Sequence, residues 1–81
     1  MGKVIAFGIR YKPTGQWKRR GIPMWRNNKF SDVPSLYFRK CDTTQAINYI
    51  HKSGNWYRNR SDEYNVANYE VVTLEMEWRE V

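Results

Sequence analysis

The stretch DTTQAINYIHKSG, residues 42–54, carries the clearest secondary-structure signal in this sequence of 81 residues. Asp42 is a favoured residue type at a helix N-cap, and Gln45 three positions later completes a pattern like a capping box. Gly54 is the residue type that suits the left-handed position just after a helix. Together these signals predict one helix over about residues 43–53.

The predicted helix has a narrow apolar stripe. Ala46, Ile47 and Ile50 lie at positions i, i+1 and i+4, so they share one helical face, with Tyr49 at its edge. We expect this stripe to be buried against a sheet. His51 lies beside the stripe, where a structural or solvated role is expected for its ring.

The residues before the helix favour a short strand. In SLYFRK, residues 35–40, Leu36 and Phe38 would share one face and Tyr37 and Arg39 the other. This pattern predicts that Phe38 contributes to the core and that Tyr37 lies in an exposed or rim position.

The residues after the helix form a polar loop over 55–65. Trp56 and Tyr57 precede Arg58 and Arg60 in this loop. The favoured interpretation packs the two aromatic rings against the end of the helix, and an exposed, ligand-binding position is the alternative.

The chain closes on the alternating run YEVVTLEMEWREV, residues 69–81. Its apolar and polar residues fall on two faces: Val72, Leu74, Met76 and Trp78 on one, and Thr73, Glu75, Glu77 and Arg79 on the other. This pattern predicts a half-buried antiparallel strand, and we expect the helix to cover its apolar face.

The N-terminal part predicts a hairpin. Between residues 3 and 11 the odd positions carry large apolar side chains: Ile5, Phe7, Ile9 and Tyr11. Lys12–Gly15, with the sequence KPTG, is a turn signal, and residues 16–20 can return as a second strand. Residues 21–34 are irregular. The fold class is therefore predicted as α+β: one domain over residues 1–81, with a small, mostly antiparallel sheet in the order β-β-β-α-β and one helix on one face.

Charge is distributed unevenly along the chain. Residues 1–40 hold ten lysines and arginines and a single acid, Asp32, which gives +9, whereas residues 41–81 have a net charge of −3. A concentrated positive field attracts polyanions, while a diffuse one mainly keeps a protein in solution. Nucleic acid is therefore a candidate partner, although many small basic proteins bind none.

The cysteine and histidine content excludes several kinds of site. A lone Cys41 cannot form an internal disulfide, and with His51 as the single histidine there is no zinc ligand set. We therefore expect no cofactor and a reducing, cytoplasmic compartment. The N-terminal apolar run is broken by Gly8 and Arg10, which makes it too short for a signal-peptide core or a membrane span.

Residues for enzymatic chemistry are sparse. His51 lacks a second histidine or a carboxylate pair, Cys41 has no evident base, and the acids of residues 70–77 lie on one predicted strand. A small ribonuclease toxin can work with Arg, Lys and Tyr alone, but such toxins normally carry helices before their sheet, whereas here a strand leads. We expect a non-catalytic protein.

The segment GQWKRRGIPMWRNNK, residues 15–29, combines aromatic and basic side chains. Aromatic faces stack on unpaired bases, and neighbouring cations bind phosphates without reading sequence, so this combination suits single-stranded RNA or DNA, with RNA favoured. The candidate binding residues are Trp17, Lys18, Arg19, Arg20, Trp25, Arg26, Lys29, Arg58 and Arg60.

A structural role is the alternative to nucleic-acid binding for this segment. Trp17 and Trp25 can fold back as structural residues, and its arginines can pair with the C-terminal acids. Lys18, Arg19 and Arg20 are expected to face solvent.

The basic aromatic N-terminal strand, the strand-then-helix run LYFRKCDTTQAINYI and the closing NYEVVTLEMEWREV resemble small accessory proteins of tailed bacteriophages, including those that counter host defences. The resemblance spans most of the chain, and it assigns no role to any single residue. It implies a protein of the bacterial cytosol that binds a host nucleic acid, nucleoprotein or enzyme. The alternative function is therefore an inhibitor that binds an acidic or nucleic-acid-binding surface of a host protein through its basic, tryptophan-containing surface.

Overall fold

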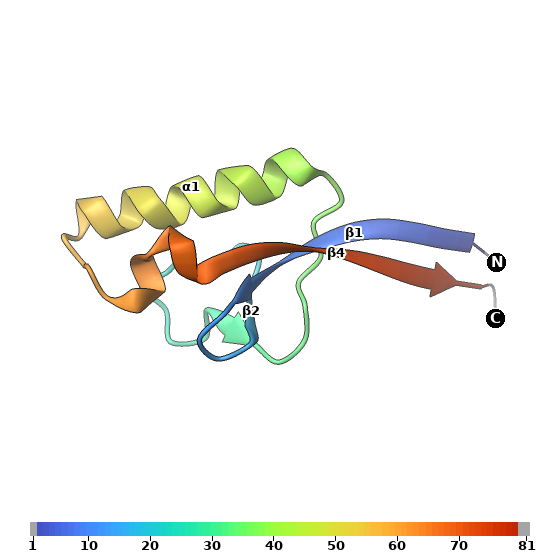
Figure 1. The fold of residues 1–81 in the computed structure, drawn as a ribbon, viewed down its shortest axis with the longest axis horizontal. Helices are drawn as coiled ribbons and strands as arrows, with labels where there is room; N and C mark the ends of the chain where they lie inside the picture. The colour runs from blue at the N-terminus through green and yellow to red at the C-terminus, as the bar shows by residue number, and fades with distance from the viewer. Residues whose placement is uncertain (1, 80–81) are drawn as a thin grey trace.

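Two long antiparallel strands, β1 (Gly2–Tyr11) and β4 (Tyr69–Trp78), pair along their whole length, with β4 at one edge of the sheet. The computed structural model describes residues 2–79. The remaining elements are β2 (Gln16–Lys18), β3 (Phe30–Ser31), the helix α1 (Lys40–Trp56) and two 3-10 turns, η1 (Asp62–Tyr64) and η2 (Val66–Asn68). The strand order is β3-β2-β1-β4, and Figure 1 shows α1 lying along one side of the sheet. The predicted α+β class with one helix is confirmed.

The predicted first hairpin is present. Gly15 closes the turn with a φ of 73°, a left-handed value that glycine adopts at low cost, and its N–H donates to the Tyr11 carbonyl at 2.9 Å. The returning strand β2 ends at Lys18 rather than at Arg20, so the basic residues that follow belong to a loop.

The predicted strand over residues 35–40 is wrong. Only Tyr37 pairs, in an isolated bridge whose two backbone hydrogen bonds to Phe7 measure 2.7 and 2.8 Å. This bridge places Tyr37 on the face of Phe7, so Tyr37 is 5% exposed while Phe38 is 59% exposed, the reverse of the prediction. The third strand of the sheet is instead β3, inside the segment expected to be irregular.

The helix is longer than predicted at both ends. Its N-cap is Arg39, which makes no side-chain capping bond, and Asp42 lies in the first turn, where both of its carboxylate oxygens accept hydrogen bonds from the Arg39 guanidinium. Gly54 lies inside the helix rather than after it. The left-handed position belongs to Arg58, with a φ of 51°.

The core lies between α1 and one face of the sheet. Ile50 of α1 is fully buried in one cluster with Ile9, Tyr11 and Tyr69. Tyr11 stacks on Phe30 with ring centroids 4.8 Å apart. The predicted apolar stripe of the helix is therefore buried where Ile50 lies, although Tyr49 is exposed.

The face of β4 that α1 covers differs from the predicted one. Register pairs Tyr11 with Tyr69 and Ile9 with Val71, so the covered face carries Tyr69 and Val71. The run of Val72, Leu74 and Met76 lies on the opposite face, and the side chain of Trp78 lies outside the described residues. The prediction missed this because Tyr69 and Val71 come before the strict alternation of the strand.

Beyond the helix, β1 and β4 continue as a ribbon that carries both chain ends (Figure 1). Ile5 and Met76 on this ribbon are exposed. In the part of the chain that the structure describes, no helix has the length and apolar character needed to cross a membrane.

Candidate nucleic-acid interface

Trp17 is held as a structural residue. Its side chain is half-buried, and its indole ring lies directly over Gly8 of β1. The guanidinium of Arg10 lies 5.5 Å from the ring centroid and is itself paired with Glu70, with Nη2 and Oε1 2.6 Å apart. Of the two roles open for this tryptophan, the structure supports the structural one.

The expectation that Lys18 faces solvent is wrong. Lys18 is 6% exposed, and its Nζ donates hydrogen bonds to the carbonyl oxygens of Arg19 and Ile22 at 2.7 and 2.5 Å. Burial, and secondarily the charge of Lys29, lowers the pKa of Lys18 to about 8. Its ammonium group is used inside the fold and is not available to a phosphate.

The next two arginines lie nearer the surface. Arg19 is half-buried and donates through Nη1 to the Asn28 carbonyl at 3.3 Å. Arg20 is exposed; it donates to the Leu36 carbonyl at 3.3 Å and lies over the Tyr37 ring at 5.4 Å. Arg20 thus keeps most of its donors for a ligand.

The second tryptophan of the segment is exposed. Trp25 is 58% exposed, and the guanidinium of Arg26 lies 4.7 Å from its ring centroid. Lys29, by contrast, has a mostly buried side chain whose Nζ lies 2.8 Å from Glu63 Oε2. Trp25 and Arg26 are therefore free for binding, whereas Lys29 ties the loop to η1.

The expectation that Trp56 and Tyr57 pack against the helix is wrong. They are 80% and 55% exposed, and they stack on each other with centroids 6.1 Å apart and an interplanar angle of 12°. Because α1 continues through Gly54, Trp56 lies seven residues after the exposed Tyr49, on the same helical face. Tyr49 was expected at the edge of the buried stripe, so the exposure of this helical face was not predicted from the sequence.

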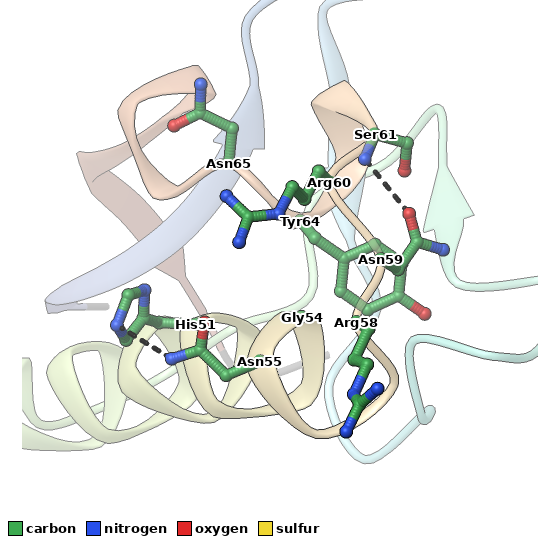
Figure 2. A pocket seen from close by; sticks show the side chains of 9 residues that line it. All are labelled: His51, Gly54, Asn55, Arg58, Asn59, Arg60, Ser61, Tyr64 and Asn65. Atoms are coloured by element: carbon green, nitrogen blue, oxygen red, sulfur yellow. Dashed lines mark hydrogen bonds between the residues drawn. The ribbon is translucent and has the colours of Figure 1, made fainter.

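Arg58 and Arg60 line a pocket of about 500 Å³ at the C-terminal end of α1, which we call the Arg60 pocket (Figure 2). Its lining residues are His51, Gly54, Asn55, Arg58, Asn59, Arg60, Ser61, Tyr64 and Asn65. The lining contains two arginines and no aspartate or glutamate. Of these residues, only the two arginines were candidates from the sequence, since the others are common polar types with no motif.

The positions of the acidic residues explain which basic side chains are left without an ion-pair partner. Glu75 pairs with Lys3 at 3.0 Å, while Glu70, Glu63 and Asp42 pair with other residues named above. The alternative in which the arginines of the basic segment pair with the C-terminal acids is therefore not seen among the acids of residues 2–79. Five exposed arginines have no carboxylate oxygen of residues 2–79 within 4.0 Å: Arg20, Arg26, Arg58, Arg60 and Arg79.

No group of three or more histidine, cysteine, aspartate or glutamate side chains that could hold a metal ion is found within residues 2–79, and Cys41 is exposed. No model of a known protein family, no curated protein sequence and no solved structure matches this chain.

Proposed function

We propose that this protein is a non-catalytic binder of single-stranded nucleic acid. One observation carries the proposal: the exposed indole rings of Trp25 and Trp56 each lie close in the chain to arginines that pair with no carboxylate of residues 2–79. These are Arg26 for Trp25, and Arg58 and Arg60 for Trp56. Exposed rings of this size are costly in water, and their neighbours supply the charge that a nucleic-acid strand requires.

The two kinds of side chain supply complementary interactions. An aromatic face stacks on any unpaired base and contributes about 1–3 kcal/mol per base. The arginine fork donates two parallel hydrogen bonds to phosphate oxygens, so it holds the backbone without reading sequence. This combination favours single strands of RNA or DNA over a duplex, whose bases are already stacked.

The cellular setting is part of the proposal. The resemblance to accessory proteins of tailed bacteriophages supports a role in the bacterial cytoplasm, where the nucleic acid would belong to the host. The charge of +6 supports binding to a polyanion in that setting.

Fluorescence anisotropy with labelled single-stranded RNA and DNA tests the proposal. We expect micromolar-range affinity that weakens steeply as salt rises from about 50 to 200 mM, and weaker binding to a duplex of equal length. A flat response to salt, or no binding at low salt, would contradict it. Capture from a bacterial lysate with and without nuclease then separates nucleic-acid binding from inhibition of a host protein. A protein partner that is still captured after nuclease treatment would favour the inhibitor.

A further inference from the structure

The Arg60 pocket has a fixed wall. The loop after α1 turns back on the helix, where the N–H of Asn59 donates to the Gly54 carbonyl at 2.9 Å and the N–H of Ser61 donates to Asn59 Oδ1 at 2.9 Å. Gly54 permits this approach, since a Cβ at that position would lie 3.0 Å from the Tyr64 Cβ. These contacts hold the backbone that carries Arg60.

Hydrogen-bond donors face the opening. Figure 2 shows the guanidinium of Arg60 reaching over the opening toward the side where His51 and Asn55 lie, whereas Arg58 points away from Arg60. Asn55 Nδ2 lies 3.3 Å from His51 Nε2. With the amide placed as the donor, Nε2 accepts, so the neutral ring carries its proton on Nδ1, where it can donate to a ligand.

The formally charged residues that line the pocket are all positive. Neither Arg58 nor Arg60 has a carboxylate oxygen within 4.0 Å among the described residues. Glu63 is bound to Lys29, and Asp62, although close in the chain, is not among the lining residues. An anion entering the pocket therefore meets two guanidinium groups and no carboxylate among the lining residues.

We propose that the Arg60 pocket binds the phosphate group of a nucleotide unit, with Arg60 as the principal ligand. A guanidinium fork matches the spacing of phosphate oxygens. The exposed Trp56–Tyr57 stack follows Asn55 in the chain and is not part of the pocket lining, so it offers an aromatic face to another base of the same strand. Identification of the phosphate as one of a nucleic-acid strand rests on the proposed function, whereas binding of the phosphate group itself does not.

The first experiment uses inorganic phosphate and the ¹⁵N-labelled full chain, at constant ionic strength with chloride as the balancing anion. We expect saturable amide shifts confined to residues 54–61 and 65. Arg60→Gln should weaken phosphate binding about tenfold or more, and Arg60→Lys, which keeps the charge but loses the fork, should weaken it less. The matched control Arg79→Gln, at the other end of the molecule, should bind phosphate as the unmodified protein does.

The second experiment compares uridine, uridine monophosphate and a single-stranded oligouridine. Uridine monophosphate should shift the same amides as phosphate, and uridine should not. Absence of saturable shifts with phosphate or the monophosphate, or an Arg60→Gln variant that binds them normally, overturns the phosphate site even if the oligonucleotide binds elsewhere. Binding of phosphate and the monophosphate without binding of the oligonucleotide supports the pocket and contradicts the proposed function.

Discussion

The indole ring of Trp17 occupies the space that a side chain at Gly8 would need. A Cβ built on Gly8 would lie 2.7 Å from Cζ3 of Trp17 and 2.8 Å from Cε3. Trp17, the first tryptophan of the basic segment, thus covers part of the sheet face opposite α1. Its role is in folding, which leaves Trp25 as the ring of that segment available for binding.

The contact between Gly8 and Trp17 predicts that Gly8→Ala destabilises the fold. The added methyl group must displace the ring, and overpacking of this kind costs about 1–3 kcal/mol. Urea unfolding measures the loss. In a Trp17→Leu background the same Gly8→Ala change should cost clearly less, and equal costs in both backgrounds would show that the ring does not lie there.

The two tryptophans should respond oppositely to alanine substitution. Trp17→Ala should lower the free energy of unfolding by about 2 kcal/mol or more, because it opens a void over Gly8. Trp25→Ala should change stability by less than about 0.5 kcal/mol, because its ring is mostly exposed, while weakening strand binding by about 1–3 kcal/mol. Thermal melts and anisotropy on both variants check this; a destabilised but binding-competent Trp25→Ala protein would contradict the assignment.

Lys18 predicts an unusual dependence of stability on pH. Its pKa falls from 10.5 to about 8 on folding because of burial first and the charge of Lys29 second. Between these values the unfolded chain binds more protons than the folded chain, so the stability should rise with pH, by about 1.5 kcal/mol between pH 8 and pH 9.5. Burial raises the pKa of Tyr37 and Tyr69 above 10.0, so these residues act in the opposite direction and lower the stability above about pH 10.

Urea unfolding at a series of pH values separates these effects. Lys18→Met should abolish the rise between about pH 8 and pH 9.5, and Lys52→Met, which removes an exposed lysine of α1, should retain it. A rise that persists without Lys18 would assign the effect to another group.

The free and paired cations of the loop should differ in the salt dependence of binding. The double variant Arg20→Gln, Arg26→Gln should flatten the slope of log affinity against log salt by about 1.4, at about 0.7 per phosphate contact on a single strand. Its melting temperature should barely change. Lys29→Gln should leave that slope unchanged and lower the stability, because Lys29 is bound to Glu63. The opposite result for either variant would reverse the assignment of these side chains.

The overall fold could be predicted from local pattern because β1, the KPTG turn, α1 and β4 each have a strong signal of their own. The third strand could not, because β3 is two residues long and forms only by pairing with β2. Pairing over so short a length depends on tertiary contacts that no local propensity reveals.

The candidate site was predictable only in part, for a similar reason. Arg20 is exposed as expected, and Trp25 and Arg26, for which a binding and a structural role were both open, are exposed too. Neighbouring Lys18 is buried, because the last residue of β2 points under the loop, where its ammonium group bonds to two backbone carbonyls. The exposure of Trp56 was missed because the helix was expected to end before this residue, whereas α1 includes it. Gly54 was expected to mark the end of the helix. In the structure it lies inside α1, where its lack of a side chain lets Tyr64 pack close to the helix backbone.

The ribbon formed by the ends of β1 and β4 implies a gradient of local opening along the two strands. β2 pairs only with residues 10 and 11 of β1 and Tyr37 bridges only Phe7, so residues 2–5 of β1 have β4 as their single partner strand. A two-stranded ribbon is marginal in water by itself. Amide hydrogens there should exchange with solvent through fraying that leaves the rest of the molecule closed. Those of Gly8 and Val72, which face each other across β1 and β4 next to the Phe7–Tyr37 bridge, should exchange only through global unfolding.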